Sequence, residues 1–156
     1  MSQEQVQNVV FVLDKIYVKD LSVEVPNAPQ VFLNREQPNI ELNFSFNTDK
    51  IDEGIYQTVL KATVNAKIKE QQLFLVEIEQ AGIFQIRNIA DGQLDLIFNI
   101  ECPTIIFPYL RETISDLTSR AGFLPVMLAP VNFTALYQQR QEQLAADKLA
   151  QDHTIN

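Results

Sequence analysis

The sequence predicts an α+β domain, in which a four-stranded antiparallel sheet is followed by two main helices. Apolar and polar residues alternate with a period of two at 39–47 and 55–68, within a strand-like first half that ends near residue 87, and apolar residues recur every three or four positions after that. The 156 residues, 46% of them hydrophobic, suffice for one core. We therefore expect a flexible start at residues 1–8, one domain at 9–146 and a flexible tail at 147–156.

The four strands are expected at residues 9–25, 39–47, 55–68 and 73–87. The alternation is clearest in the second strand, where apolar residues occupy every other position and polar residues lie between them. The last three strands follow one another through turns, at 49–54 and 69–72, with no helix between them. Such strands pair antiparallel.

A proline-rich loop separates the first two expected strands. Pro26, Pro29 and Pro38 fix backbone φ angles and remove amide donors, so this segment cannot form regular structure. The loop nevertheless carries consecutive apolar residues at 31–33. Loops of this length in compact domains are often functional.

Helical periodicity begins after residue 87. A short helix is predicted within residues 91–100, and a longer one begins near Pro103, because a first helical turn tolerates proline. Pro108 is expected either to kink this helix early or to mark its true start. Gly122 should end it.

A proline-punctuated apolar linker at residues 123–132 leads to the last helix. Asn132 is its expected N-cap. Helical spacing places five residues on one stripe of that helix, namely Phe133, Leu136, Tyr137, Arg140 and Leu144.

Enzyme chemistry and metal binding find little support in the sequence. The only cysteine and the only histidine are Cys102 and His153, which cannot make a zinc site. The four glycines are too scattered for a phosphate-binding loop. Glu77 and Glu79 point to one open face of a strand, where carboxylates are usually solvated. We expect no catalytic residue, no cofactor and no metal.

Charge and hydropathy limit the partners and the compartment. The chain has 20 acidic and 12 basic residues, a net charge of −8, which disfavours nucleic acid and anionic lipid surfaces. The first residues show no signal-peptide pattern, and no apolar stretch approaches the ~20 residues that span a bilayer. We expect a cytoplasmic protein without direct membrane insertion.

Two apolar segments lie where loops are normally polar. They are Phe32 and Leu33 in the long loop, and residues 123–128 in the linker. Such clusters either mark a binding surface or fold back onto the core, and the sequence leaves both readings open.

Four ordered motifs, running in register from about residue 10 to 140, resemble the SecB family of export chaperones. The first joins IYVKDLS at residues 16–22 to EVPNAP at 24–29. The others are LVEIEQAGIF at 75–84, CPTIIFPYLRE at 102–112 and LAPVNFTAL at 128–136. Residues 90–99 match the family poorly, and no function is carried onto them.

The resemblance implies a fold, an assembly and a function. Two chains would pair their sheets into eight strands, and two such dimers would pack as a homotetramer. The protein would be an ATP-independent holdase that keeps secretory preproteins unfolded and passes them to the motor ATPase SecA.

The resemblance also implies three sets of functional residues. The positions matching SecA docking are Asp20, Glu24, Leu75 and Glu77. The positions matching tetramer stability are Val76, Ile78 and Gln80. The client-binding groove would be lined by Val31, Phe32, Leu33, Ile40, Leu42, Phe44, Leu136 and Tyr137.

Two other classes of protein compete with this interpretation. A small-molecule binder or a cone-shaped α+β enzyme would curl its sheet around one closed apolar cavity. A dedicated chaperone of a toxin–antitoxin system would share the fold but bind a single client.

The absence of a phosphate-binding loop from the sequence predicts that client holding needs no nucleotide. The purified protein should suppress aggregation of a denatured client equally with ATP, with ADP and without nucleotide, as measured by light scattering. A requirement for ATP would contradict this expectation.

Overall fold

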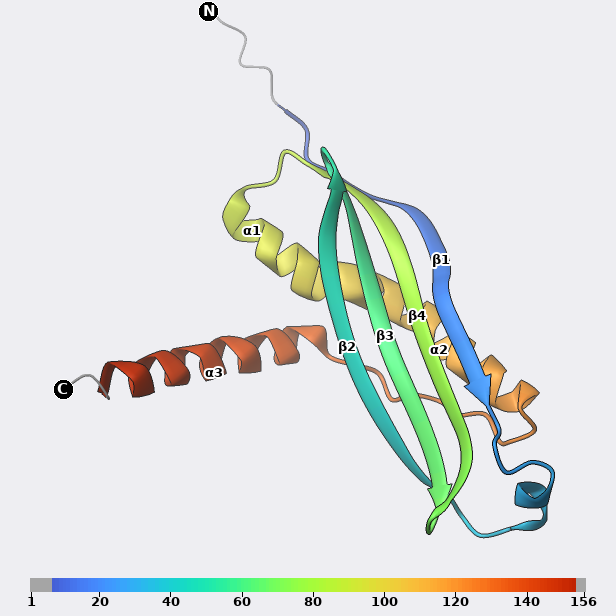
Figure 1. Cartoon of the computed structure of the whole chain (residues 1–156). Helices are drawn as coiled ribbons and strands as arrows, with labels where there is room; N and C mark the ends of the chain where they lie inside the picture. Colours follow the sequence, from blue (N-terminus) through green and yellow to red (C-terminus); the bar gives the residue numbers. More distant parts are fainter. Residues whose placement is uncertain (1–6, 154–156) are drawn as a thin grey trace, which may run out of the picture.

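The computed structural model describes residues 7–153 as one antiparallel sheet with helices on one of its faces (Figure 1). The strands are β1 (Val10–Glu24), β2 (Asn39–Asp52), β3 (Ile55–Ile68) and β4 (Gln71–Arg87), in the order β1-β4-β3-β2. The helical elements are η1 (Gln30–Leu33), α1 (Asp91–Leu96), η2 (Ile97–Glu101), α2 (Cys102–Arg120) and α3 (Phe133–His153). The predicted α+β class with a four-stranded antiparallel sheet is confirmed.

The two central strands, β3 and β4, divide the sheet into two faces by strict alternation. On the inner face, which α2 covers, Ala62 pairs with Ile78 and Val64 with Val76, and all four side chains are buried. The side chains between them, such as Lys61 and Glu77, lie on the opposite face, which we call the open face. Ile106, Leu110 and Ile114 of α2 complete the core at helical spacing.

The packing of α2 against the sheet depends on Gly82 of β4. A Cβ atom at this position would lie 3.0 Å from Cδ1 of Ile106 and 3.3 Å from Cδ1 of Ile16. Both side chains would have to move, so the glycine permits the close approach of the helix.

The ends of α2 follow the sequence signals only in part. Pro103 lies in the first turn, as predicted, but Pro108 lies inside the helix and does not start it. At the other end Gly122 has a φ of +95°, and the N–H of Phe123 donates to the carbonyl of Thr118 at 3.1 Å. This geometry is a Schellman motif, and it ends the helix at Gly122, as the sequence predicted.

Several other boundaries differ from the expected ones. β2 extends to Asp52, well beyond residue 47, and the turn to β3 shrinks to Glu53 and Gly54. The short helix α1 does not stop before α2 but continues into it through the π-helical turn η2. α3 runs to His153 and so extends into residues 147–153, where the sequence predicts the start of the tail. Most of the predicted flexible start lies outside the described residues.

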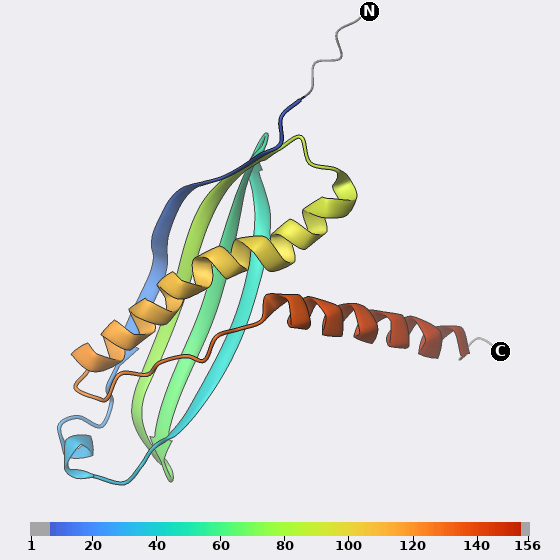
Figure 2. The same ribbon diagram turned by 180° about the vertical axis from the view of Figure 1, so that it is seen from behind.

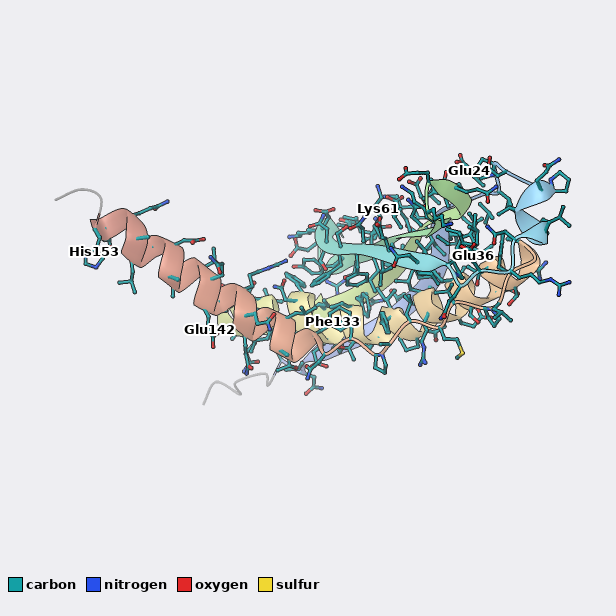
Figure 3. All side chains as sticks on the ribbon, turned by 90° about the horizontal axis from the view of Figure 1, so that it is seen from below. Glu24, Glu36, Lys61, Phe133, Glu142 and His153 are labelled. Atoms are coloured by element: carbon teal, nitrogen blue, oxygen red, sulfur yellow. The ribbon has the colours of Figure 1, made fainter. Side chains whose placement is uncertain are left out.

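The last part of the chain crosses the inner face and then leaves the body (Figure 2). After α2, residues 121–132 run back over the strands to the side where β2 forms the edge. There the side-chain Oδ1 of Asn132 accepts from the N–H of Ala135 at 3.0 Å, which confirms the predicted N-cap. α3 starts at this cap and projects away from the sheet (Figure 3).

A substitution of Val76 tests the assignment of the inner face, because this β4 side chain pairs with Val64 of β3 and is 0% exposed. Val76→Asp should lower the free energy of unfolding by about 3 kcal/mol or more, since the new carboxylate would have no buried partner. Urea denaturation and light scattering would measure the loss of stability and any smaller species. Leu75→Asp, one residue away on the open face, is the control and should cost much less; equal costs would contradict this assignment of faces.

Candidate functional site

An apolar groove of about 690 Å³ lies between the long loop, the start of β2 and the linker. Its floor contains Val31 and Phe74, which are buried, and its rim contains Phe32, Leu124 and Met127, which are exposed. The ring of Phe123 joins the two sides, with centroids 5.2 Å from Phe32 and 4.9 Å from Phe74. We call this cavity the loop groove.

Specific hydrogen bonds hold the walls of the loop groove in place. In the long loop, the N–H of Val31 donates to the carbonyl of Asn27 at 2.9 Å, forming the turn that directs Val31 inward. The side-chain Nδ2 of Asn27 donates to the carbonyl of Gln72 at 2.8 Å and ties the loop to the β3–β4 hairpin. In the linker, the N–H of Val126 donates to Oγ1 of Thr118 at 2.9 Å.

A second groove, of about 500 Å³, lies between β2 and α3, and we call it the helix groove. Phe44 and Phe46 of β2 meet Phe133 of α3 with ring centroids 6.0 and 5.6 Å apart. Phe107 of α2 closes this aromatic cluster from the core side, 6.0 Å from Phe133. The guanidinium of Arg140 lies 5.9 Å from the ring centroid of Phe46, within reach of a cation–π interaction.

Polar groups of α1 and η2 fix α3 beside the helix groove. The hydroxyl of Tyr137 donates to Oδ2 of Asp95 at 2.6 Å, and Arg140 Nη1 donates to Oδ1 of Asn99 at 3.4 Å. Asn99 Nδ2 in turn donates to the carbonyl of Asp95 at 2.7 Å. The hydrogen bond to Asp95 raises the pKa of Tyr137 above its ordinary value, because it favours the protonated phenol.

A strip of β2 connects the two grooves on the inner face. Ile40, which lines the loop groove, and Leu42 are both 44% exposed, because this part of β2 is not covered by α2, which reaches the strand only further along, at Phe44. Phe44, the next residue on this face, lines the helix groove. The result is an open apolar surface, not the single closed cavity that a cone-shaped enzyme would need.

The structure brings most of the predicted groove residues together. Val31, Phe32 and Ile40 line the loop groove, whereas Phe44, Leu136 and Tyr137 line the helix groove. Leu42 lies between the two grooves and lines neither of them, and Leu33, which is 82% exposed, also lines neither.

Some lining residues were not predicted. The sequence marked the apolar linker as unusual but did not assign it, although residues 122–129 form one wall of the loop groove. Asp95 and Asn99 carried no signal, because nothing in a local pattern links them to a helix more than forty residues later.

The four predicted docking residues gather on the open face of β1 and β4. Glu24 pairs directly with Leu75, Glu77 lies opposite Ser22, and Asp20 lies opposite Glu79. Glu24 and Lys61 lie on the side of the sheet away from α2 (Figure 3). These four residues therefore form an acidic patch with one apolar member at this end of the open face, and Lys61 on β3 borders the patch opposite Glu79.

The three residues predicted to affect assembly lie inside the protomer. Val76, Ile78 and Gln80 are buried on the inner face, and Gln80 Nε2 donates to the carbonyl of Tyr17 at 3.1 Å. The exposed apolar residues of this region lie instead on β1, the other edge strand. These residues are Val18, Leu21 and Val23. They lie on the inner face, because Leu21 pairs with Ile78 and Val23 pairs with Val76.

The remaining chemistry of the described residues is limited. Burial raises the pKa of the Cys102 thiol to about 12, so this side chain stays protonated at neutral pH and is a poor nucleophile. Residues 7–153 contain no group of three or more acidic, histidine or cysteine side chains placed to hold a metal ion. Within the same residues, no helix has the length and apolar character to cross a membrane.

Comparisons with known proteins agree with the fold. The family model described as preprotein translocase subunit SecB matches residues 3–144. Protein-export protein SecB of Nitrosospira multiformis is 54% identical, covering 92% of this chain and 89% of its own length. The SecB of Methylobacillus flagellatus is 53% identical, covering 94% and 97%. A solved SecB-like chaperone of Mycobacterium tuberculosis, in complex with a peptide from the HigA1 antitoxin, has a TM-score of 0.65 and 17% identity, covering 79% of this chain and 91% of that one.

The hydrogen bond from Tyr137 to Asp95 is expected to hold α3 in place beside the helix groove. Tyr137→Phe removes the hydroxyl donor and should increase tryptic cleavage after Arg140 several-fold, while the unfolding temperature of the sheet changes little. Mass spectrometry of timed digests would measure the rate. Tyr109→Phe, on the exposed side of α2, is the matched control; equal cleavage in both variants would show that this bond does not hold α3.

Proposed function

The chain is a member of the SecB family of preprotein translocase subunits, and on that basis we propose that it keeps unfolded secretory preproteins in an export-competent state and delivers them to SecA. The SecB relatives that are more than 50% identical carry the name of protein-export proteins, which favours this activity over that of a toxin–antitoxin chaperone. The likeness to the mycobacterial chaperone supports the fold alone.

The open apolar surface on the inner face is the observation that supports client holding. Two grooves of about 690 and 500 Å³, joined by Ile40 and Leu42, offer places for several apolar side chains of one extended segment. Wide pockets with few fixed polar groups accept many sequences, which a general holdase requires. A folded client hides its apolar residues, so this surface selects unfolded chains.

The open face is the proposed docking surface for SecA. Asp20, Glu24 and Glu77 supply negative charge on adjacent strands, and Leu75 supplies an apolar contact between them. A basic partner surface would be attracted at long range by these charges and by the net charge of −8. Clients and SecA would then occupy opposite faces of the same sheet and could bind at the same time.

The proposed assembly is a homotetramer built as a dimer of dimers. Among residues 7–153 the outer edge of β1 has no neighbouring strand, and its inner face exposes Val18, Leu21 and Val23. Pairing of two β1 edges would give an eight-stranded sheet and leave β2 at both outer edges. Packing of two such sheets would cover the remaining apolar residues.

Holding and delivery as proposed use no cofactor and no catalysis by this chain. The protein would act in the cytoplasm on preproteins before their export, without inserting into the membrane and without binding nucleic acid. Its energy source would be the ATPase cycle of SecA rather than a nucleotide site of its own.

Two charge substitutions should separate the two proposed surfaces. Glu77→Lys reverses a charge on the open face and should weaken SecA binding at least about tenfold, while suppression of client aggregation persists. Leu42→Glu places a charge between the two grooves and should weaken client holding, while SecA binding persists. Calorimetric titration with SecA and light scattering of a denatured client measure the two activities.

Matched variants control for the added charges. Asp49→Lys makes the same charge reversal on the open face but at the outer strand, and Asn43→Glu adds a carboxylate next to Leu42 but on the other face. Circular dichroism must first show that all four variants are folded. Normal SecA binding by Glu77→Lys would show that the open face is not the docking surface. Normal client holding by Leu42→Glu would show that the strip between the two grooves does not bind clients.

A further inference from the structure

The outer edge strand β2 lacks two of the usual protections against pairing, namely bulges and proline. Among residues 7–153 it pairs with β3 alone. Exposed edges are normally interrupted by bulges or proline. The register from Asn39 to Lys50 has no bulge, this stretch contains no proline, and residues 39–43 are all exposed. This edge can therefore accept another strand.

The direction of the backbone groups on β2 follows from the other strands. All residues on one face of a strand direct their N–H and C=O groups to the same side. On the inner face of β4, the N–H of Ile86 donates at 3.0 Å to the carbonyl of Gly54, just before β3. Inner-face residues of β4 and β3, such as Ile78 and Ala62, therefore bond to each other.

The same alternation leaves the inner-face groups of β2 without a partner strand. The open-face residues of β3 bond to the open-face residues of β2, such as Thr63 to Asn43. The inner-face residues Ile40, Leu42 and Phe44 consequently direct their N–H and C=O groups outward. The residues with apolar side chains in the grooves are thus also the ones with free backbone groups.

A strand added to this edge would meet two different surfaces. It would lie about 4.8 Å from β2, so its inward side chains would lie beside Ile40 and Leu42 and face the exposed Leu124 and Met127 of the linker. Its outward side chains would lie on the open face beside a polar row, and Lys61 and Lys67 of β3 pair with two members of this row, which is made of Asn39, Glu41, Asn43 and Ser45. This environment favours a segment that alternates apolar with polar residues, and the net charge of −8 attracts segments whose polar residues are basic.

We propose that β2 binds an extended client segment as a fifth strand, with its apolar side chains directed into the two grooves and its polar or basic side chains on the open face. This inference rests on the proposed holding function and gives it a backbone component that is independent of client sequence. A second copy of β2 is a poor occupant, because it would bring the acidic residues of two edges together. An antiparallel segment is preferred, since such pairing is slightly stronger.

A pair of backbone-methylated peptides tests the proposal. The probe is a short fluorescein-labelled peptide that alternates leucine or phenylalanine with lysine, and its binding is measured by fluorescence anisotropy. In an antiparallel fifth strand the apolar residues direct their N–H groups toward β2, so N-methylation at those positions should weaken binding at least about tenfold. N-methylation at the lysines should change the affinity by less than about threefold, because those N–H groups face solvent.

A change in β2 itself provides an independent measurement. Leu42→Pro removes the outward N–H as well as the side chain, whereas Leu42→Ala removes the side chain only. The proline variant should bind the probe at least about tenfold more weakly than the alanine variant. Amide hydrogen exchange of the unaltered protein should show Leu42 and Phe44 exchanging fast alone and slowly with the probe.

The possible outcomes separate this inference from the proposed function. If the unmethylated probe and a denatured client both fail to bind, the holding function itself is wrong. If both bind and the two methylations have equal effects, holding occurs through side chains only and the fifth strand is wrong. A converse pattern, with only lysine methylation harmful, would show a parallel fifth strand. Slow exchange of Leu42 and Phe44 without probe would show that another copy of the chain already occupies the edge.

Discussion

The width of one helix, set against a sheet of four strands, is the constraint from which the surfaces of this protein follow. A helix with its side chains is about 10 Å across, and neighbouring strands lie about 4.8 Å apart, so α2 covers little more than two strands. It packs on β3 and β4 through the close approach at Gly82, and there the core is fully buried. Parts of the inner faces of the two edge strands lie beyond the reach of α2 and are left exposed although their sequences are apolar. Leu21 and Val23 on β1 and Ile40 and Leu42 on β2 are the residues affected.

The two uncovered edges differ in their surroundings, and this difference suits them to different partners. The inner face of β1 has exposed aliphatic residues but neither groove, which suits association with a flat, complementary surface such as a second copy. The inner face of β2 lies between two grooves with walls made by the linker, the long loop and α3. Walls of this kind suit individual side chains of a chain that is not folded. Exposed apolar area of this kind would be a liability in an isolated monomer, and the net charge of −8 counteracts self-aggregation.

The strict alternation of β3 and β4 separates these apolar functions from the polar open face. Val76 and Glu77 are adjacent in the chain, but one is buried under α2 and the other lies among acidic neighbours on the far side of the sheet. A substitution on the open face can therefore change that surface without changing the inner face, so the two proposed binding surfaces can be tested separately. The same geometry explains why residues that match positions affecting assembly, such as Ile78, lie in the core: they support the inner face on which both edges depend.

The sequence by itself determined the features that depend on local geometry. Period-two alternation assigned Val76 and Glu77 to opposite faces, Gly122 marked the end of α2 because only a residue tolerant of positive φ fits there, and Asn132 marked the start of α3 through its capping side chain. The motifs at residues 16–29, 75–84, 102–112 and 128–136 identified the family. Tertiary structure alone decided which apolar residues of the long loop line a groove. Val31 is 1% exposed on the floor of the loop groove, whereas Leu33, two residues later, points to solvent. It also decided that Leu42 stays exposed on an inner face and that Asp95 holds Tyr137. These outcomes depend on where α2 and the linker lie across the sheet, and no local pattern of residues encodes the distance between segments that meet only after folding.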